Sequence, residues 1–280
     1  MGIKLIAIDL DGTLLDSNRM VSEENFDAIQ EAKAAGIKVV LCTGRPLRSM
    51  SYLLDEVGLK SEEDLAITYN GGLIQKTNTG EIVHEMTLTR DDCLAIYELS
   101  QLLNLPVNFI DLDFVYEPTY PVGRESIYNK GLTNIPADQA LQFSNIDIQD
   151  LPNPFTINKA VMSRPAHELD EVISKIPKEF HEKFNIYKSQ DTILEILPQN
   201  VDKGHAMRIV GEMLNLDKSE IMGIGDQEND LSLVQQAGVG VAMGNAIDIV
   251  KESATYITKT NDESGVAHAI RKIALQSQNL

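Results

Sequence analysis

The feature that most constrains the fold is an alternation of short apolar runs with stretches that carry helix signals. The first three apolar runs cover residues 3–9, 37–43 and 65–69. Between the first two, Ser22 is a typical N-cap and Gly36 a typical helix end, and Pro46 and Gly58 frame the next helical stretch. This pattern predicts a parallel β-sheet whose strands are joined by crossover helices.

The same pattern returns near the end of the chain, after a middle segment of different character. Helices are predicted at 204–214 and 230–237, strands at 221–224 and 239–243, and two further helical stretches follow. Residues 84–198 contain more Pro, Asn and aromatic residues. They are predicted to form strands 107–110, 157–162 and 184–188 and helices 91–103 and 166–176. We therefore predict an α/β fold with a Rossmann-like core, residues 1–83 and 199–280, and an inserted α+β domain, residues 84–198.

Composition excludes several classes of protein. The net charge is −18 and the pI is near 4.6, so the chain lacks the basic surface typical of proteins that bind nucleic acid or anionic membranes. Two cysteines are too few for a disulfide framework or a multi-cysteine zinc site. Asp9 and Asp11 interrupt the first apolar run, so a signal peptide is not expected there. No stretch of about 18 apolar residues, the length of a membrane-spanning helix, occurs. We expect a cytoplasmic protein without a membrane or nucleic-acid partner, and the sequence carries no signal of its oligomeric state.

Polar residues follow several predicted core strands, at the point where each strand ends. The segments are Asp9-Leu10-Asp11-Gly12-Thr13, Thr43-Gly44-Arg45, and Gly225-Asp226-Gln227-Glu228-Asn229-Asp230. Lys203 lies just after the inserted domain, at the start of the helix predicted at 204–214. Ligands of open α/β sheets bind outside the carboxyl ends of the strands, so these segments are expected to converge on one site.

The residue types at this edge indicate a site for a hard cation and a phosphate group. Asp9, Asp11 and Asp226 offer the oxygen ligands that Mg²⁺ prefers. Lys203 and Thr43, with backbone N–H groups near Gly12 and Gly44, are suited to hold phosphoryl oxygens. An ionised carboxylate attacks a phosphate ester only when the charge of the ester is neutralised, which a metal ion and a lysine achieve. Asp9 as nucleophile and Asp11 as acid and base fit this chemistry.

The order of these segments resembles a known family. The Asp9–Thr13 segment, Thr43-Gly44-Arg45-Pro46, Lys203-Gly204 and the Gly225–Asp230 segment match, in order, the four motifs of the haloacid dehalogenase-like hydrolases. The insertion between the second and third motifs is similar to that of the Cof-type branch. The similarity to YidA-type sugar phosphatases extends over nearly the whole chain and includes the segments 67–72, 187–189, 194–197 and 238–243.

The resemblance implies a role for each residue of the site. Asp9 would be the phosphorylated nucleophile and Asp11 the acid/base. Mg²⁺ would take the Asp9 carboxylate, the Asp11 backbone carbonyl and Asp226, with Asp230 in support. The phosphate-binding residues implied are Leu10 through its backbone, Thr43, Gly44, Lys203 and Asn229. The inserted domain would be a mobile cap that closes over a small phosphorylated metabolite, with sugar phosphates favoured.

Single residues in and around these segments allow other interpretations. An EF-hand loop is excluded because its sixth and twelfth positions would be Leu14 and Met20. Arg45 and Arg48 fit either an anionic substrate or an acidic surface. Asn70-Gly71-Gly72 is interpreted first as a turn, with a role near the substrate as the minority alternative. Cys42 is expected to be a buried strand residue, and the five histidines lack metal-ligand spacing.

Three rival functions remain open. A phosphotransferase or phosphomutase would use the same aspartyl phosphate but pass it to a sugar hydroxyl. A receiver-like signalling domain would store phosphate on Asp9, although it would not need the large insertion. A dinucleotide-binding protein is disfavoured because no G-x-G-x-x-G follows the first strand. The sequence therefore predicts an Mg²⁺-dependent phosphomonoesterase.

Overall fold

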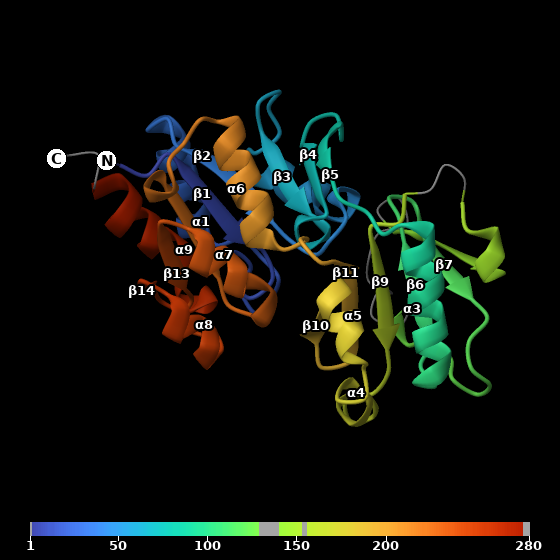
Figure 1. Ribbon diagram of the computed structural model, residues 1–280. Helices are drawn as coiled ribbons and strands as arrows, with labels where there is room; N and C mark the ends of the chain where they lie inside the picture. Colours follow the sequence, from blue (N-terminus) through green and yellow to red (C-terminus); the bar gives the residue numbers. More distant parts are fainter. Residues whose placement is uncertain (1, 129–139, 153–155, 277–280) are drawn as a thin grey trace. The chain divides into compact units, whose positions relative to one another are not determined.

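The structure, a computed structural model, describes residues 2–128, 140–152 and 156–276. It divides into two units (Figure 1): Met1–Glu85 with Asp202–Leu280 form the first, and Met86–Val201 form the second. The predicted domain boundaries after residues 83 and 198 lie close to these divisions. Each unit has its own sheet and its own apolar core.

The first unit is built around one large sheet with β1 in its interior. The strands are β1 (Leu5–Asp9), β2 (Lys38–Cys42), β3 (Leu65–Thr68), β4 (Leu73–Lys76), β5 (Ile82–Glu85), β12 (Ile221–Gly225), β13 (Val239–Ala242) and β14 (Tyr256–Ile257). Their order in the sheet is β14-β13-β12-β1-β2-β3-β4-β5. Pairing is parallel from β14 to β3 and antiparallel from β3 to β5. The predicted parallel α/β core is confirmed.

Helices cover both faces of this sheet. They are α1 (Glu23–Ala34), α2 (Ser51–Glu56), α6 (Lys203–Met213), α7 (Leu231–Gln236), α8 (Asp248–Ser253) and α9 (Gly265–Ala269). Short helical turns are η1 (Leu47–Met50), η2 (Tyr69–Gly71), η5 (Lys218–Glu220), η6 (Glu228–Asp230), η7 (Asn261–Glu263) and η8 (Ile270–Leu275). Side chains alternate along β1: Ile6 and Ile8 pack in the core beside α1 and α9, whereas Leu5 and Ala7 pack beside α6. Both faces of β1 are therefore buried, as expected for a strand in a parallel sheet.

Local signals set several helix ends. Ser22 caps α1, because its side chain accepts a hydrogen bond from the backbone N–H of Asn25. The helix predicted after Pro46 is divided into η1 and α2, since the backbone of Met50, with φ −116°, departs from helical geometry. Cys42 is fully buried at the end of β2, as predicted.

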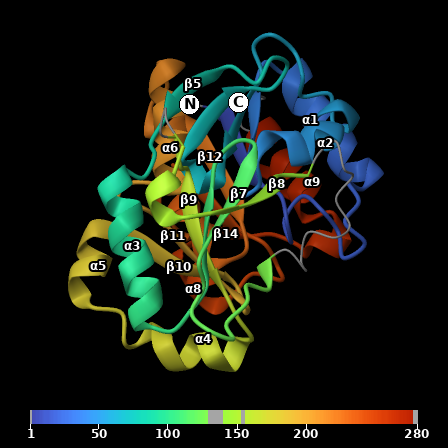
Figure 2. The ribbon, with the colours of Figure 1, turned by 90° about the vertical axis from the view of Figure 1, so that its right-hand side faces the viewer.

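The second unit is a mixed sheet with helices on one face. Its strands are β6 (Val107–Ile110), β7 (Phe114–Pro118), β8 (Gln142–Ile146), β9 (Lys159–Ser163), β10 (Phe184–Gln190) and β11 (Ile193–Pro198), in the order β10-β11-β9-β6-β7-β8. The helices α3 (Arg90–Leu102), α4 (Ala166–Ile173) and α5 (Lys178–Lys183) lie beside this sheet (Figure 2), and η4 (Ile148–Asp150) follows β8. Ile96 of α3 and Leu169 of α4 share one apolar core with Phe109 and Met162 of the sheet. This is the expected α+β architecture.

Several boundaries in the second unit differ from the prediction. The strand expected at 157–162 starts at Lys159, because Ile157 forms an isolated bridge with Leu88. The helix expected at 166–176 ends at Ile173, where Ser174 is the C-cap. A buried ion pair joins the neighbouring strands β9 and β11, with 3.0 Å between Lys159 Nζ and Glu195 Oε2.

Among the described residues, no helix combines the length and the apolar character needed to cross a membrane.

Candidate active site

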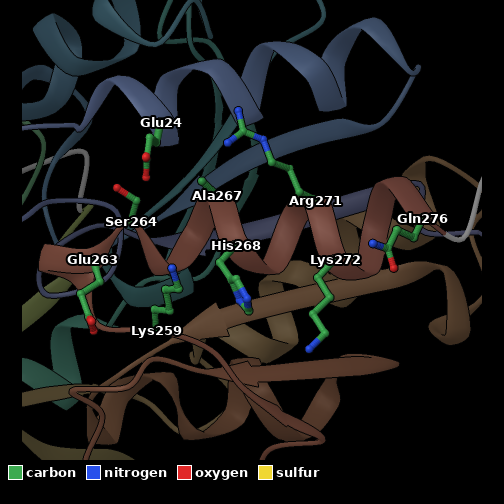
Figure 3. Close-up of a pocket in the computed structure, with 9 residues that line it drawn as sticks. All are labelled: Glu24, Lys259, Glu263, Ser264, Ala267, His268, Arg271, Lys272 and Gln276. Atoms are coloured by element: carbon green, nitrogen blue, oxygen red, sulfur yellow. The ribbon is translucent and has the colours of Figure 1, made fainter.

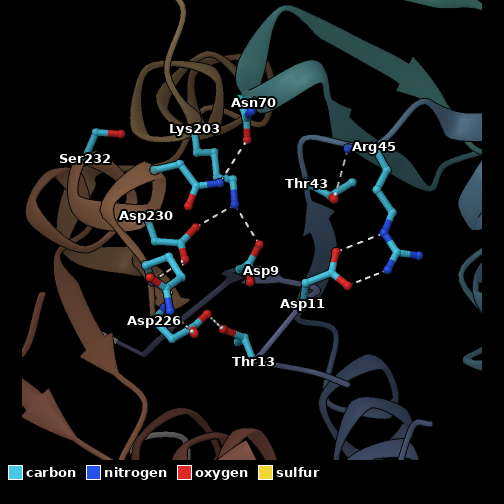
Figure 4. Close-up of polar contacts among 12 residues, drawn as sticks. Asp9, Asp11, Thr13, Thr43, Arg45, Asn70, Lys203, Asp226, Asp230 and Ser232 are labelled. Atoms are coloured by element: carbon cyan, nitrogen blue, oxygen red, sulfur yellow. Dashed lines mark hydrogen bonds and ion pairs between the residues drawn. The ribbon is translucent and has the colours of Figure 1, made fainter. Parts of the chain in front are cut away.

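Four segments of the first unit meet at the carboxyl edge of its sheet (Figure 4). They follow β1, β2 and β12, and the fourth begins α6. Each of the neighbouring strands β1, β2 and β12 ends at this edge because all three run in parallel. The segments singled out in the sequence therefore do come together.

A buried lysine bridges two of the carboxylates. Lys203 Nζ lies 2.6 Å from Asp9 Oδ1 and 2.6 Å from Asp230 Oδ1, and the Lys203 side chain has no exposed surface. Lys203 is the first residue of α6, whose N-cap Asp202 accepts a hydrogen bond from the His205 N–H. The cap fixes the start of the helix, and with it the place from which the lysine reaches across the sheet edge.

Asp226 and Asp230 are joined through the turn between them. Asp230 Oδ2 accepts hydrogen bonds from the backbone N–H of Asp226, at 2.9 Å, and of Gln227, at 3.0 Å. Thr13 donates its hydroxyl to Asp226 Oδ1 at 2.9 Å. Both oxygens of Asp230 are thus occupied by Lys203 and the turn. Asp230 therefore orients the lysine and Asp226.

Gly12 permits the segment after β1 to approach Asp226 closely. Its φ of +81° is strained for residues with a side chain, and a Cβ at this position would lie 2.5 Å from Asp226 Oδ2. Asn245, in the loop after β13, donates to the Gly12 carbonyl at 2.8 Å. A larger residue at position 12 would push the β1 loop away from Asp226.

Burial dominates the electrostatics of this cluster. It raises the pKa of Asp9 well above the usual value, and the nearby Asp230 carboxylate adds to this effect while Lys203 opposes it. Burial and the charge of Asp230 likewise raise the pKa of Asp226 to about 6, against the hydrogen bond from Thr13. Burial alone would lower the pKa of Lys203, but the carboxylates of Asp230 and Asp9 outweigh it and raise that pKa. One ammonium group thus contacts two of three buried carboxylates, those of Asp9 and Asp230.

This donor set fits a divalent cation. One oxygen from each of Asp9, Asp226 and Asp230 lies within 4.8 Å of the others, and all three residues are buried. Within the described chain, Asp9 Oδ2 accepts no hydrogen bond, and Asp226 Oδ2 has only long contacts to Gln227 at 3.3 Å and Asn245 at 3.5 Å. Oxygen ligands with surplus negative charge are what Mg²⁺ requires.

The residues predicted to bind phosphate line the same edge. Thr43 is buried directly after β2, and its hydroxyl accepts a hydrogen bond from the Arg45 N–H at 3.2 Å. Leu10 is fully buried, and its carbonyl accepts from the Leu15 N–H at 2.9 Å, which closes the loop after β1. Asn229 lies in η6 and donates its amide to Asn70 Oδ1 at 3.1 Å.

Asp11 is the exception among the predicted residues, because its carboxylate points away from the cluster. It forms a two-pronged ion pair with Arg45, whose Nε donates to Asp11 Oδ2 at 2.9 Å and whose Nη2 donates to Oδ1. The Asp11 side chain is 54% exposed. Of the two interpretations of Arg45, the structure therefore favours pairing with an acidic side chain, and that side chain belongs to the first motif.

Two polar residues at this edge were not assigned to the site from the sequence. Asn70 was interpreted first as a turn residue, and the turn is present as η2. Asn245 was missed, although it follows the predicted strand 239–243 and the rule applied to the other strands would have found it. Both contact segments of the predicted site.

A cavity of about 450 Å³ lies elsewhere in the first unit, beside α9 (Figure 3). Its lining includes Lys259, His268, Arg271 and Lys272, and Arg271 is held by Glu31. It contains none of the predicted site residues. The candidate active site is therefore located by the chemistry of its side chains and not by the size of a cavity.

The fold and the acidic cluster together define an α/β protein with an aspartate-based site at the carboxyl edge of its sheet. The chain belongs to the haloacid dehalogenase-like hydrolases, because the model of that family matches residues 6–270.

Similar proteins support this assignment over the full length. YxeH of Bacillus subtilis (strain 168), a provisionally named phosphatase, is 42% identical over 97% of this chain and 98% of its own. The 5-amino-6-(5-phospho-D-ribitylamino)uracil phosphatase YcsE of the same organism is 34% identical over 96% and 95%. A solved haloacid dehalogenase-like hydrolase from Bacteroides thetaiotaomicron is 30% identical, with a TM-score of 0.79 over 96% of this chain and 99% of that one.

Proposed function

We propose that the protein is an Mg²⁺-dependent phosphatase that hydrolyses small phosphorylated metabolites through an aspartyl phosphate on Asp9. The observation that carries this proposal is the buried group of Asp9, Asp226 and Asp230 around a single Lys203. A buried cluster with this much surplus negative charge is costly in a protein without a ligand cation. Its cost is understandable if the cluster serves metal and phosphate binding.

Asp9 acts as the nucleophile in this proposal. Its Oδ1 is held by Lys203, so the carboxylate is fixed in place and Oδ2 is the oxygen that attacks phosphorus. A bond forms between Asp9 Oδ2 and phosphorus while the bond from phosphorus to the leaving alkoxide breaks. Water then attacks phosphorus, and the carboxylate leaves with phosphate as the product. Lys203 stays protonated throughout and offsets the charge of the phosphoryl oxygens.

Asp11 is assigned the acid and base role. It protonates the leaving oxygen in the first step and removes a proton from water in the second. Since the Asp11 carboxylate is paired with Arg45, this role requires the side chain to leave Arg45 and turn toward Asp9. The high exposure of Asp11 leaves room for such a rotation.

The remaining polar groups bind the phosphoryl oxygens. These groups are the backbone N–H of Leu10, the Thr43 hydroxyl, the Gly44 N–H, the Lys203 ammonium and the Asn229 amide. Backbone and amide N–H groups at fixed positions stabilise the charge that spreads over the equatorial oxygens during transfer.

The metal would be held by the Asp9 carboxylate, the Asp11 backbone carbonyl and Asp226, with Asp230 in support. When bound, Mg²⁺ neutralises charge on the phosphate and on the carboxylates. The loosely bonded Asp226 Oδ2 supports this choice of ligands.

Sugar phosphates and related polyol phosphates are the favoured substrates. The name of the relative YcsE specifies a substrate whose phosphate is carried by a ribityl chain. In the sequence, the second unit is inserted between the segments that carry Asn70 and Lys203. We propose that it is a cap that sets selectivity. We also propose a cytoplasmic location, in keeping with two buried free cysteines.

The test is phosphate release from a panel of sugar phosphates, a ribityl phosphate and p-nitrophenyl phosphate, with Mg²⁺ and with EDTA. Parent protein, Asp9→Asn and a control variant, Asp55→Asn, are compared; the exposed Asp55 lies in α2 and pairs with Lys60. We expect release that needs Mg²⁺, is lost in Asp9→Asn, and is unchanged in Asp55→Asn.

Release from Asp9→Asn at the parental rate would refute the role of Asp9. Phosphate transfer that appears only when a sugar acceptor is added would instead identify a phosphotransferase or phosphomutase. A phosphorylated protein that forms but does not turn over would indicate a signalling role.

A further inference from the structure

A buried turn beside the candidate active site has an unusual backbone. Tyr69, Asn70 and Gly71 follow one another with φ of 51°, 55° and 103°. Left-handed conformation costs roughly 1–2 kcal/mol for a residue with a side chain, and here a tyrosine and an asparagine adopt it consecutively while almost fully buried. Strain of this kind is kept where the surroundings require it.

The turn joins three segments of the candidate site. The backbone N–H of Asn70 donates to the Thr43 carbonyl at 2.9 Å, and the Asn70 side chain accepts from the Asn229 amide at 3.1 Å. Gly71 lies against the Asp202 carbonyl, where a Cβ would be only 2.3 Å away. The turn is thus packed against the segments that carry Thr43, Lys203 and Asn229.

The Asn70 amide also explains why residue 44 is a glycine. A Cβ on Gly44 would lie 2.8 Å from Asn70 Nδ2 and 3.1 Å from Asn70 Oδ1. The amide therefore lies flat against the open side of the Gly44 backbone, between the second motif and Asn229.

The hydrogen bond between the two amides has a direction. Asn229 donates through Nδ2 and Asn70 accepts through Oδ1. Reversal of the Asn229 amide would place its carbonyl oxygen against Asn70 Oδ1, and two acceptors cannot bond. One hydrogen of Asn229 Nδ2 bonds to Asn70, and the described residues provide no acceptor for the second, which can therefore bind a ligand oxygen.

We propose that Asn70 is a positioning residue which fixes the amide of Asn229 so that its N–H₂ group, and not its oxygen, meets the phosphoryl group. This rests on the proposed phosphatase function, in which Asn229 binds phosphate. Asn70 acts through Asn229 and does not itself touch the reacting atoms.

The test separates the amide of Asn70 from its backbone. Glycine adopts φ near 55° without strain, so Asn70→Gly keeps the turn and removes the amide. Asn215→Gly is the matched control, because Asn215 has the same φ of 55°, is exposed, and follows α6. Both variants are compared with Asn229→Ala and with the double variant Asn70→Gly/Asn229→Ala.

Four quantities are measured for each protein with Mg²⁺ present: kcat, KM, the Kd for inorganic phosphate by calorimetry, and Tm. We expect Asn70→Gly to raise KM and the phosphate Kd about tenfold, the scale of one hydrogen bond to a charged group, with kcat within about threefold. The double variant should bind phosphate within about twofold of Asn229→Ala, because Asn70 acts through Asn229. Asn215→Gly should match the parent.

Separate outcomes overturn the inference and the proposed function. The inference fails if Asn229→Ala weakens phosphate binding while Asn70→Gly keeps the parental Kd, or if the two effects multiply in the double variant. It also fails if Asn70→Gly lowers Tm and kcat with KM and Kd unchanged, since that pattern describes a structural turn. A parent protein that neither binds inorganic phosphate nor releases it from any ester refutes the proposed function and the inference together.

Discussion

Replacement of Asp226 by asparagine should stabilise the metal-free protein while it removes the response to Mg²⁺. The pKa of Asp226 in the folded protein is about 6, against an ordinary value of 3.8. Each unit of difference corresponds to about 1.4 kcal/mol, so the ionised carboxylate costs the folded state about 3 kcal/mol at neutral pH. Asparagine carries no charge and avoids this cost.

The gain is reduced by hydrogen bonds that asparagine cannot accept. The amide oxygen of the Asp226→Asn variant can still accept from Thr13, but its NH₂ group would face the amide donors of Gln227 and Asn245. Loss of these long contacts removes about 1 kcal/mol. The expected net gain is about 2 kcal/mol, which raises Tm by about 4 °C for a chain of this size.

The sign of the pH dependence follows from the raised pKa. Between about pH 4 and 6 the folded parent binds more protons at Asp226 than the unfolded chain does, so parental stability falls as the pH rises through this window. The advantage of Asp226→Asn is therefore absent below about pH 4 and reaches its full size above about pH 7.

Urea unfolding in EDTA, followed by circular dichroism at several pH values, measures this difference. The same experiment with Mg²⁺ should stabilise the parent and leave Asp226→Asn nearly unchanged. A variant that is less stable than the parent at pH 7.5, or one that Mg²⁺ stabilises as much as the parent, would refute the electrostatic account of the site.

Three further substitutions test other parts of the structure. Lys203→Met leaves the buried carboxylates without their ammonium partner and should lower the free energy of unfolding by about 3–5 kcal/mol at pH 7. Part of this stability should be regained at pH 5. Equal urea midpoints for variant and parent at pH 7 would contradict this expectation. Gly44→Ala places a methyl group against the Asn70 amide and should cost about 1–3 kcal/mol and weaken phosphate binding, whereas parental Tm and phosphate Kd would show that the amide moves freely. In the second unit, Lys159→Met should lower the free energy of unfolding by about 3–5 kcal/mol, because it leaves Glu195 buried without its lysine. Lys159→Met/Glu195→Leu should recover most of this loss, as measured by urea unfolding. A double variant no more stable than the single one would show that the buried charge of Glu195 is not the cause.

The sequence was sufficient to predict the parallel core and the convergence of its polar segments. Every strand of the parallel part except β14 gave a clear apolar run, because such strands are buried on both faces. The short edge strand β14, with only Tyr256 and Ile257, has no such run. β4 and β5, which extend the sheet as antiparallel strands, were not predicted because their mixture of apolar and polar residues resembles a loop.

The geometry of individual side chains could not be predicted in the same way. Nothing in the residue order indicates that the Asp11 carboxylate is held by Arg45 instead of pointing at Asp9. The position of Asn70 depends on a left-handed backbone that sequence patterns associate with turns in general. Both features result from tertiary contacts between segments that are distant in the chain.

The position of β1 in the sheet has a consequence for the order in which the molecule is assembled. One edge of β1 pairs with β2, about 30 residues later, and the other pairs with β12, about 200 residues later. Closing the longer loop costs about 1.7 kcal/mol more in chain entropy than closing the shorter one, before any compaction of the residues between them. During synthesis on the ribosome, one edge of β1 therefore stays unpaired until β12, in the last quarter of the chain, has been made. The proposed nucleophile, Asp9, is among the first residues synthesised, whereas Lys203, which holds its carboxylate, is synthesised about 190 residues later. A chain shortened before Lys203 would therefore contain Asp9 but lack the lysine that positions it.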